Sequence, residues 1–458
     1  MPAKPSLPKG TRDFGPQEVQ RRQYIIQHIR TVFESFGFQP IETPSFENLE
    51  TLLGKYGEEG DRLVFKILNN GDYLRSYRGS SESPTEVDLS KVTEQISKRG
   101  LRYDLTVPFA RYAVMHQNEF ALPFKRYQIQ PVWRADRPQK GRFQEFYQCD
   151  ADVVGSKSLL QEVDLIHIYD QVFHRLGLDV EIRVNHRGLL TALSELIQAP
   201  DQVTDLTVAL DKLDKIGRDG VEKEWRERGL SQAAIERLAP LFEMPDNFEA
   251  QFDVLEDMLG HFESGREALN QMRFLFSTAS ELGLSKAVLR WDVTLARGLN
   301  YYTGPIFEVV STEVELGSIG GGGRYDDLTS VFGGNQLPGV GISFGLDRIY
   351  LVLDELNRFP ETVANETQLL FVNFGETEAV WCLKWAQELR AAGIRCEVYP
   401  EAAKMKKQMT YADRKGIPFV AMVGSREIES GRLALKDMQQ GEQAELTPEE
   451  VIERIKAS

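Results

Sequence analysis

The sequence predicts an α/β protein of about three domains, and three observations support this prediction. Its 458 residues correspond to about three domains at roughly 150 residues each. Residues 100–155 alternate short apolar runs with Arg, Asp and Pro, which is typical of strands joined by a hairpin. Residues 186–285 have apolar residues at helical spacing among many charges, and residues 369–423 alternate strand and helix patterns as in a small, mainly parallel α/β domain.

The composition excludes several classes of protein. Hydrophobic residues make up 41% of the chain and charged residues 27%, so wholesale disorder is excluded. The net charge of −15 argues against a protein that coats nucleic acid or anionic membrane with a basic surface. Three scattered cysteines do not suit a disulfide framework. Since no apolar leader begins the chain and no apolar run approaches the roughly 18 residues of a spanning helix, we expect a cytoplasmic protein.

Local signals define the elements. Ile25, Ile29 and Phe33 recur at helical spacing within residues 16–36, and Gly37 ends that helix. Thr447-Pro-Glu-Glu450 is a capping box for a terminal helix. The same signals indicate an extended edge segment at 38–44, a mobile polar surface loop at 78–96, a helix at 158–176 and a strand at 180–184.

These elements group into domains with the following expected boundaries. They are a core in two parts (1–185 and 286–355), a helical insertion (186–285), a linker (356–366) and a C-terminal α/β domain (367–458).

The hairpin carries the first candidate site. Between Lys125 and Arg142 six basic residues face one acid, Asp136, an excess of five positive charges inside an acidic chain. Such a hairpin could bind a polyphosphate, because the planar guanidinium group of arginine binds two phosphate oxygens at once. A solvated charged hairpin is the alternative, with about equal weight.

A second candidate is the segment 291–308, where Arg297 precedes Tyr301 and Tyr302. On a regular strand the two tyrosines would face opposite sides, so a pocket needs a bend, which Gly298 permits. An ordinary strand with core aromatics is the alternative.

Two glycine-rich segments are further candidates. Residues 317–327 contain four consecutive glycines, which let a backbone approach a ligand closely, or which form a flexible loop. They match neither a dinucleotide fingerprint nor a phosphate-binding P-loop. In residues 338–349 a glycine-spaced strand leads into a helix whose first turn carries Asp347 and Arg348. That arginine could reach a phosphate, and a plain strand–helix joint is the alternative.

The last candidate is a carboxylate–hydroxyl pair. Asp104 and Thr106 would share one face of a strand and could hold an ammonium group. Nucleophilic catalysis is poorly supported, because no Gly-x-Ser-x-Gly occurs and Cys149 has no evident histidine partner. Arginine electrostatics around phosphates is the chemistry that remains.

Taken in order, these segments resemble the histidyl-tRNA synthetases, which are class II aminoacyl-tRNA synthetases. Lys9-Gly-Thr-Arg-Asp13 is similar to the N-terminal motif of the family. The three class motifs are matched by residues 16–44, 132–152 and 339–349, and the two histidine-specific motifs by residues 295–302 and 318–326.

The resemblance implies a fold and an activity. The fold would be the antiparallel sheet of class II synthetases with flanking helices, a helical insertion and an anticodon-binding domain from about residue 367. The activity would be formation of histidyl-adenylate from L-histidine and ATP with Mg²⁺, followed by transfer of histidine to tRNA(His). Motif 1 would form a homodimer interface.

The resemblance also implies roles for individual residues. The histidine-binding residues would be Asp104, Thr106, Arg134, Gln148, Asp152, Arg297, Tyr301 and Tyr302. The ATP-binding residues would be Arg134, Asp136, Arg142 and Arg348, with Arg348 also against adenine. Arg134 and Arg297 would be catalytic, acting on the α-phosphate, and Arg137 and Gln139 would meet the acceptor end of tRNA. No metal site made of protein ligands alone is implied.

The chain departs from the family pattern at two places. Asp136 stands where the class motif has Glu, and Asp104-Leu-Thr106 stands where another branch has Glu-Gly-Thr. Two other functions stay open: a synthetase-like regulatory subunit of ATP phosphoribosyltransferase, and another class II synthetase such as a prolyl or threonyl enzyme. Against the first, Arg134, Arg297 and Arg348 are all present and a C-terminal domain follows.

Arg297 generates the first testable prediction. We expect Arg297→Ala to abolish histidine-dependent ATP–pyrophosphate exchange while histidine still binds, because the arginine would stabilise charge that develops on the α-phosphate. Exchange near the wild-type rate would contradict this role.

Overall fold

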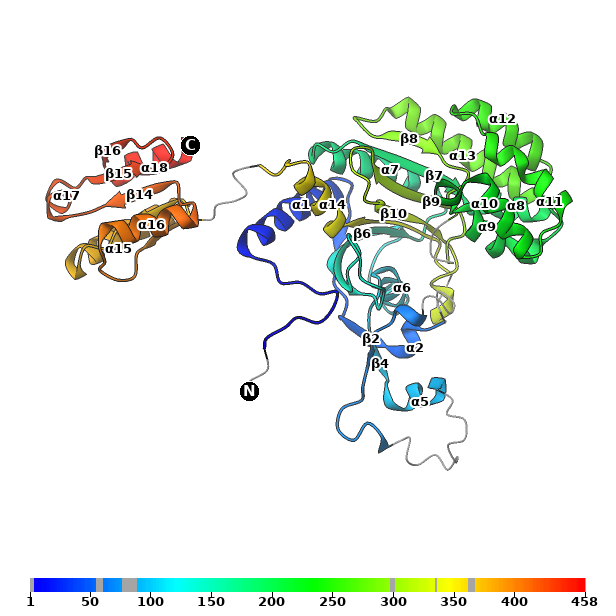
Figure 1. The fold of residues 1–458 in the computed structure, drawn as a ribbon, viewed down its shortest axis with the longest axis horizontal. Coiled ribbons are helices and arrows are strands. Elements are labelled where there is room, and N and C mark those ends of the chain that lie inside the picture. The colour runs from blue at the N-terminus through cyan, green and yellow to red at the C-terminus, as the bar shows by residue number, and fades with distance from the viewer. Residues whose placement is uncertain are drawn as a thin grey trace. The chain divides into compact units, whose positions relative to one another are not determined.

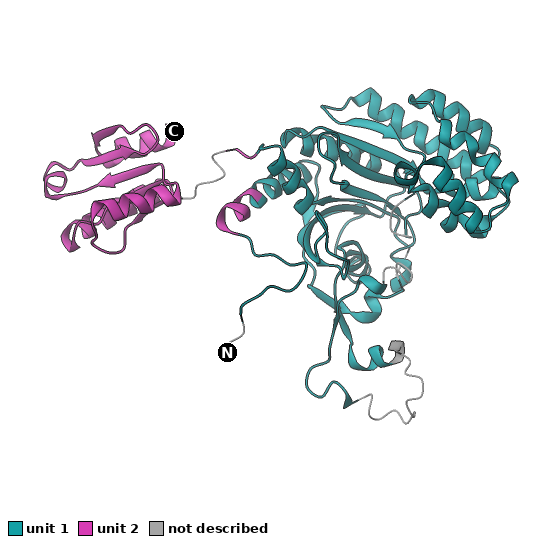
Figure 2. Cartoon of the chain, viewed as in Figure 1, with its two compact units in different colours: residues 1–14, 22–358 teal, residues 15–21, 359–458 magenta. Residues whose placement is uncertain are grey.

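The computed structural model describes residues 4–54, 61–75, 89–296, 301–333, 336–360 and 367–457. The chain forms two compact units, which Figure 2 colours separately: residues 1–14 with 22–358, and residues 15–21 with 359–458. The finer division into a two-part core, an insertion and a linker stays a prediction. In the described ranges, no helix is both long and apolar enough to cross a membrane.

The first unit is built on a large, mainly antiparallel sheet (Figure 1). Its strand order is β1-β5-β6-β11-β10-β9-β7-β8, and only the edge pairs β1–β5 and β7–β8 are parallel. The strands are β1 (Gln39–Pro40), β5 (Phe124–Trp133), β6 (Glu145–Val154), β7 (Val180–His186), β8 (Val288–Trp291), β9 (Pro305–Ser311), β10 (Ser318–Tyr325) and β11 (Gly339–Gly345). This confirms the expected class of fold.

Two helices cover the back of this sheet. Helix α1 (Pro16–Ser35) places Phe33 on the rings of Tyr127 and Phe344, at centroid distances of 5.6 and 5.8 Å. Helix α7 (Leu160–Arg175) places Tyr169 on the same Phe344 ring at 4.8 Å. Since side chains alternate along a strand, the neighbours of Phe344 on β11 face the opposite, open side of the sheet.

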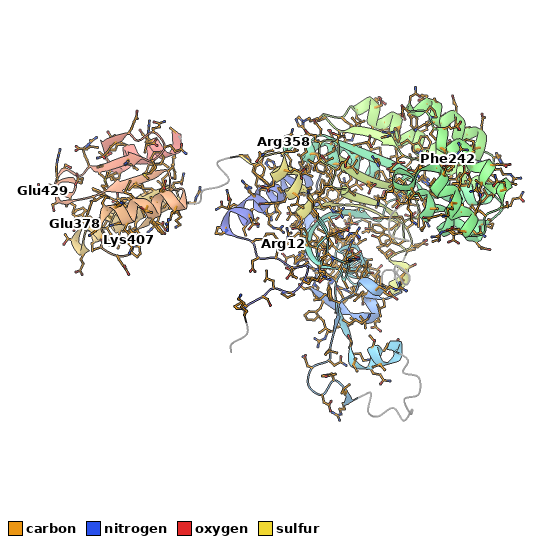
Figure 3. The ribbon with its side chains drawn as sticks, viewed as in Figure 1. Arg12, Phe242, Arg358, Glu378, Lys407 and Glu429 are labelled. Carbon is orange, nitrogen blue, oxygen red and sulfur yellow. The ribbon has the colours of Figure 1, made fainter. Side chains whose placement is uncertain are left out.

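Helix α14 (Leu346–Glu355) follows β11 directly, as the sequence indicates. Arg358, labelled in Figure 3, lies just beyond the helix and ties it to the turn after α7. Its Nη1 donates to the carbonyl of Gly177 at 2.7 Å and pairs with Glu313 at 2.6 Å.

A small sheet of order β2-β4-β3 lies in the same unit. Two helices next to it in the sequence differ from the sequence predictions. Residues 89–96 form a helix rather than a surface loop, and residues 78–88 lie outside the described ranges. Residues 106–115 are helical too, so Asp104 lies in a loop and Thr106 begins a helix; the strand predicted for this pair is wrong. The elements are β2 (Phe46–Asn48), α2 (Leu49–Leu52), β3 (Lys66–Ile67), α5 (Leu89–Ile96), β4 (Arg99–Leu101) and α6 (Thr106–Met115).

Helices fill residues 187–282 and gather as one bundle beside β7–β9, drawn in green in Figure 1. They are α8 (Arg187–Leu196), α9 (Val203–Leu210), α10 (Leu213–Glu227), α11 (Gln232–Leu238), α12 (Phe248–Leu259) and α13 (Glu263–Leu282). His186 caps α8, because its Nδ1 accepts the Gly188 N–H at 2.9 Å. Trp225 is fully buried and its indole donates to the Leu206 carbonyl at 3.0 Å, which joins α10 to α9.

The second unit contains a five-stranded sheet of order β13-β12-β14-β15-β16. Strands β13, β12 and β14 are parallel, whereas β14–β15 and β15–β16 are antiparallel, so the mainly parallel sheet that the sequence indicates is in fact mixed. The hairpin of β15 and β16 is the part that sequence reasoning missed. The elements are β12 (Leu369–Phe371), α15 (Glu376–Ala391), β13 (Cys396–Val398), α16 (Met405–Lys415), β14 (Phe419–Met422), α17 (Ser425–Ser430), β15 (Leu433–Asp437), β16 (Gln443–Leu446) and α18 (Pro448–Ala457).

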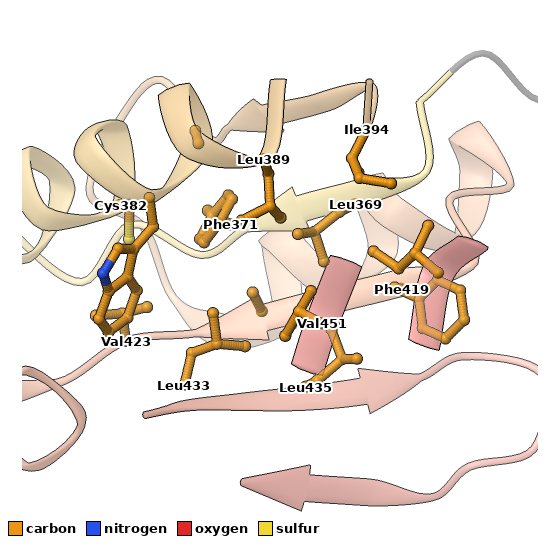
Figure 4. Packing of buried hydrophobic residues seen from close by; sticks show 14 residues of the cluster. Leu369, Phe371, Cys382, Leu389, Ile394, Phe419, Val423, Leu433, Leu435 and Val451 are labelled. Atoms are coloured by element: carbon orange, nitrogen blue, oxygen red, sulfur yellow. The ribbon is translucent and has the colours of Figure 1, made fainter. Parts of the chain in front are cut away.

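An apolar core holds this unit together. Helices α15 and α18 pack Leu389 and Val451 on the sheet residues Phe371, Phe419 and Leu435 (Figure 4). The predicted capping box starts α18: Thr447 Oγ1 accepts the Glu450 N–H at 3.3 Å, and the Glu450 carboxylate accepts the Thr447 N–H at 2.8 Å.

The consecutive glycines form a central strand, β10, rather than a flexible loop. One of these glycines, Gly323, and Gly341 from β11 leave space for the side chains above the sheet. A Cβ on Gly323 would lie 2.8 Å from the ring of Tyr302, and a Cβ on Gly341 would overlap the Asp152 carboxylate. The glycines therefore make a hollow in the open face of the sheet.

This hollow makes a testable prediction. We expect Gly341→Ala to destabilise the protein by about 1–3 kcal/mol, because the added methyl group displaces a buried carboxylate. Thermal unfolding monitored by circular dichroism would measure it. Gly345→Ala on the same strand is the matched control, since its Cβ would lie 3.5 Å from the Ile319 carbonyl oxygen, an ordinary contact. Equal melting temperatures for the two variants would contradict the prediction.

Candidate active site

The candidate site lies on the open face of the large sheet. Gln148, Asp150 and Asp152 alternate along β6 and so share that face. Across the antiparallel register Asp152 lies opposite Arg126 of β5 and Gly341 of β11, and Asp150 lies opposite Ser343. The sheet thus sets a row of polar side chains beside strands that carry glycine.

A cavity of about 340 Å³ opens at one end of this row. Its polar wall includes the three arginines that the sequence assigns to ATP, Arg134, Arg142 and Arg348, together with Asp136 and Glu308. The other lining residues are Gly141, Phe143, Phe146, Gln148, Leu295, Tyr302, Phe307, Ser318, Ile319, Gly320, Gly321, Gly322, Ser343, Gly345 and Asp347.

Backbone carbonyls orient two of the arginines. Arg134 Nε donates to the carbonyl of Tyr103 at 2.9 Å, and its guanidinium lies 5.2 Å from the Phe146 ring centre. Arg348 Nε donates to the carbonyl of Gly141 at 2.9 Å and Nη1 to that of Ser318 at 2.5 Å. Because a planar guanidinium group binds phosphate oxygens in pairs, a cavity with three arginines in its wall suits a polyanion.

Asp347 connects the elements around the arginine-lined cavity. Its Oδ1 pairs with Arg12 of the N-terminal segment, labelled in Figure 3, and with Arg22 Nη1 of α1 at 2.5 Å. Its Oδ2 accepts the backbone N–H of Tyr147 on β6 at 3.0 Å. The carboxylate side chain is 5% exposed. Asp347 therefore fixes the position of its neighbour Arg348 relative to the hairpin.

A second, smaller cavity of about 40 Å³ continues the first. Gln148, Tyr302, Ser343, Gly321 and Gly322 line both cavities. The residues that line only the smaller one are Asp104, Thr106, Asp150, Asp152, Tyr301, Tyr325, Gly341 and Ile342.

The smaller cavity is rich in buried carboxylates. Asp104, Asp150 and Asp152 are each at most 2% exposed, and Arg126, fully buried, pairs with Asp152 at 2.7 Å. Tyr325 donates its hydroxyl to Asp152 Oδ1 at 2.6 Å. This pocket therefore suits a small ligand that carries a positive charge or N–H donors.

The pKa values follow from this burial. Burial raises the pKa of Asp150 to about 7, an effect that Arg126 opposes and Asp152 reinforces. Burial also raises the pKa of Asp152 above its usual range, and Arg126 and Tyr325 oppose that shift. The buried phenol of Tyr302 has a raised pKa for the same first reason. Since excess buried negative charge is costly, a cationic ligand would relieve it.

The structure brings most of the sequence-predicted residues together. Asp104, Thr106, Gln148, Asp152, Tyr301 and Tyr302 line the smaller cavity, and Arg134, Asp136, Arg142 and Arg348 line the larger. Arg137 and Gln139 lie exposed at the tip of the hairpin and line neither cavity. Arg297 and Gly298 lie outside the described residues.

The structure also divides the expected basic patch on the hairpin. Arg126 is buried against Asp152, and Lys125 pairs with Asp164 at 2.8 Å. The excess of five charges that the sequence suggests is therefore not one continuous surface.

Sequence reasoning missed several residues of the site. Asp150, Ser343 and Glu308 line the cavities without having been singled out, and Arg126 was counted only as a charge. One signal was available for Asp150, because alternation along a strand places it between Gln148 and Asp152. No local signal pointed to Ser343, which depends on pairing between β11 and β6.

A mainly antiparallel sheet with an arginine-lined cavity beside a pocket for a small polar ligand is the arrangement of a class II aminoacyl-tRNA synthetase, the class that the motifs indicated. Comparison with known proteins narrows the class. The histidyl-tRNA synthetase family model matches residues 10–74 and 70–349, and an anticodon-binding domain model matches residues 368–458. The chain belongs to the histidyl-tRNA synthetase family.

Individual relatives are similar to this chain over nearly its whole length. It is 56% identical over 448 residues to a histidine–tRNA ligase of Christiangramia forsetii, covering 97% of this chain and 98% of the relative. A histidine–tRNA ligase of Flavobacterium johnsoniae is also 56% identical, over 461 residues and 97% of each chain.

Solved structures support the fold. The crystal structure of histidyl-tRNA synthetase from Nostoc sp. PCC 7120 gives a TM-score of 0.82 at 30% identity and 99% coverage of both chains. A structure from Bacillus halodurans, described as an ATP phosphoribosyltransferase regulatory subunit/histidyl-tRNA synthetase, gives 0.73 at 21% identity, covering 92% of this chain and 99% of that one, which shows the fold alone.

Asp347 makes the prediction of this section. We expect Asp347→Asn to lower the free energy of unfolding by about 3 kcal/mol, because Arg12 and Arg22 lose the carboxylate that neutralises them. Chemical unfolding in urea would measure the change. Glu355→Gln, on the same helix, removes an exposed pair with Lys140 at 3.3 Å and should change stability by less than about 1 kcal/mol. Similar effects of both variants would contradict the role of Asp347.

Proposed function

We propose that this chain activates L-histidine with ATP to histidyl-adenylate and pyrophosphate, and then transfers histidine to the 3′ end of tRNA(His). One observation carries the proposal: the arginine-lined cavity and the carboxylate pocket share a wall. An amino acid lying across this wall reaches phosphates with its carboxylate and the pocket with its side chain.

The first step needs positioning rather than a protein nucleophile. A histidine carboxylate oxygen attacks the α-phosphorus of ATP, the bond to the bridging oxygen breaks, and pyrophosphate leaves. Arg134 would hold both the α-phosphate and the attacking carboxylate, which brings two anions together. Arg297 would stabilise the negative charge that develops on the α-phosphate.

The outer phosphates would be bound by Arg142 and Arg348, and Arg348 would also lie against adenine. The carbonyls of Gly141 and Ser318 hold Arg348 in place before ATP binds, so little reorganisation is needed. Asp136 lines the same cavity, one methylene shorter than the glutamate of the class motif.

Magnesium would enter with ATP. Asp136 and Glu308 are the carboxylates on the wall of the larger cavity besides Asp347, which pairs with arginines. Carboxylate oxygen is the ligand type that Mg²⁺ prefers, usually alongside phosphate oxygens and water. The ion would neutralise charge on the phosphates.

Selection of histidine would rest on the smaller pocket. Asp104 and Thr106 would bind the α-ammonium group, and Asp152, Tyr301 and Tyr302 would pair with the ring nitrogens. A site built from hydrogen-bonding groups rejects side chains that lack the matching donors and acceptors, because its buried groups would then be left unpaired.

The second step would use the exposed tip of the hairpin. Arg137 and Gln139 lie at this tip and would guide the acceptor end of tRNA, whose terminal ribose hydroxyl attacks the carbonyl carbon of histidine and releases AMP. The C-terminal unit would contact the anticodon. Because few phosphates would be touched, binding should weaken with salt along a shallow slope.

The assembly and location of the enzyme follow the family. We propose a homodimer joined through motif 1, and a cytoplasmic enzyme.

Two competing functions make different demands. A regulatory subunit of ATP phosphoribosyltransferase would not need the set of ATP-binding arginines, whereas Arg134, Arg142 and Arg348 line one cavity here. A synthetase for proline or threonine would not need the carboxylate pocket to offer partners for two ring nitrogens.

The test is ATP–pyrophosphate exchange with each of the twenty amino acids offered singly. We expect exchange with histidine alone, followed by histidine-dependent charging of tRNA(His). Exchange with another amino acid would identify a different synthetase. Histidine binding without exchange would support the regulatory subunit.

A further inference from the structure

A turn in the N-terminal segment lies against the hairpin of β5 and β6. The Thr11 N–H donates to the Pro8 carbonyl at 3.3 Å, and Gly10, the third residue of this turn, has a φ of 81°. A type II turn needs a positive φ at its third residue, which favours glycine there. We call residues 8–12 the N-terminal strap.

Gln144 joins the strap to the hairpin. Its backbone N–H donates to the Gly10 carbonyl at 2.9 Å, and its own carbonyl accepts the Arg134 N–H at 2.9 Å. Its side-chain Nε2 donates to the Asp136 carbonyl at 3.0 Å. The contact is close, because a Cβ on Gly10 would lie 2.7 Å from Gln144 Cγ and 2.9 Å from Pro138 Cγ. The strap therefore contacts the residue that connects the two sides of the hairpin just beyond β5 and β6.

Arg12 makes the second connection between the strap and the hairpin. Its guanidinium carbon lies 3.4 Å from the ring centre of Phe143, and the same group pairs with Asp347 on α14. A cation over an aromatic face is attracted to it. Phe143 lines the larger cavity, whereas Arg12 does not. Arg12 therefore holds a wall residue of the cavity without lining the cavity itself.

The backbone around Arg142 is thus held on both sides. On one side Arg348 Nε donates to the Gly141 carbonyl at 2.9 Å. On the other side the strap contacts Phe143 and Gln144. Arg142 lies between these two attachments and lines the larger cavity, where it is assigned to the outer phosphates of ATP. Its placement therefore depends on the strap as well as on Arg348.

We propose that Arg12 is a positioning residue: it acts through Phe143, alongside the bond from Gln144 to Gly10, to hold the hairpin in the conformation that binds ATP. The inference rests on the proposed function and deepens it. It gives Arg12 no contact with ATP and gives the strap no part in histidine binding, because none of residues 8–12, all of which the structure describes, lines either cavity.

Separate Michaelis constants for ATP and for histidine in the exchange reaction distinguish this role from a general structural one. For Arg12→Ala we expect the KM for ATP to rise about tenfold, because ordering of the hairpin would then have to accompany ATP binding. The KM for histidine, measured at saturating ATP, should stay within about twofold.

Gly10→Ala tests the backbone connection. The added methyl group would clash with Gln144 and Pro138, so the KM for ATP should again rise about tenfold while the KM for histidine changes little. Gly229→Ala is the matched control. Gly229 also has a positive φ, 92°, but a Cβ there would meet no described atom within 4 Å. It carries a similar backbone strain without the contact and should keep the parent KM for ATP.

Two more variants test the contact between Arg12 and Phe143. Arg12→Lys keeps a cation beside Asp347 and near the Phe143 ring, so it should recover most of the ATP affinity. In the double variant of Arg12→Ala with Phe143→Ala the two increases in the KM for ATP should not multiply, because both substitutions remove one contact.

The remaining outcomes overturn the inference. Equal increases of both Michaelis constants in Arg12→Ala would indicate a general distortion, and an effect of Gly229→Ala as large as that of Gly10→Ala would indicate backbone strain alone. A parent-like KM for ATP in Arg12→Ala and Gly10→Ala, with histidine-dependent exchange intact in the parent enzyme, would remove the role of the strap and leave the proposed function standing. A parent enzyme without histidine-dependent exchange would remove both.

Discussion

The site depends on one steric constraint: the middle strands of the large sheet carry glycine where other strands carry side chains. A Cβ on Gly323 would lie 2.8 Å from the Tyr302 ring, and one on Gly341 would overlap Asp152. On the opposite face Phe344 packs against α1 and α7, so side chains also fill the space behind the sheet. The hollow therefore lies in strands whose other face is packed against helices, which suits a reaction that depends on alignment.

Charge is divided between the two ends of this hollow. Arginines held by neutral backbone carbonyls line the end assigned to phosphates, and carboxylates that outnumber their buried arginine line the end assigned to histidine. An acidic chain with a net charge of −15 thus contains an arginine-lined cavity that suits a polyanion. Asp347 lies between the two ends of the hollow. It pairs with Arg12 and Arg22 and also accepts the Tyr147 N–H of β6, the strand that carries Gln148.

Much of the fold was predictable where the signals are local. The hairpin of β5 and β6, the strand leading into α14 and the capping box of α18 follow from patterns within about ten residues. The errors share a cause: in each, packing or pairing with distant segments overrides the local pattern. Thr106 was placed on a strand because it alternates with Asp104, yet tertiary packing makes it the first residue of α6. Four glycines have low strand propensity, yet pairing with β9 and β11 on both sides holds them in β10.

The sequence by itself determined the family and predicted ten of the residues that line the two cavities, since motif residues keep their order and spacing along the chain. Only the tertiary structure decided which side chains lie against these residues and hold them in position. Asp347 meets Arg12 from the far end of the first unit, and Ser343 meets Asp150 across the register of two strands that are distant in sequence. A local pattern states which face a side chain takes, but its partner depends on strand order and register, which the packing of the whole sheet selects.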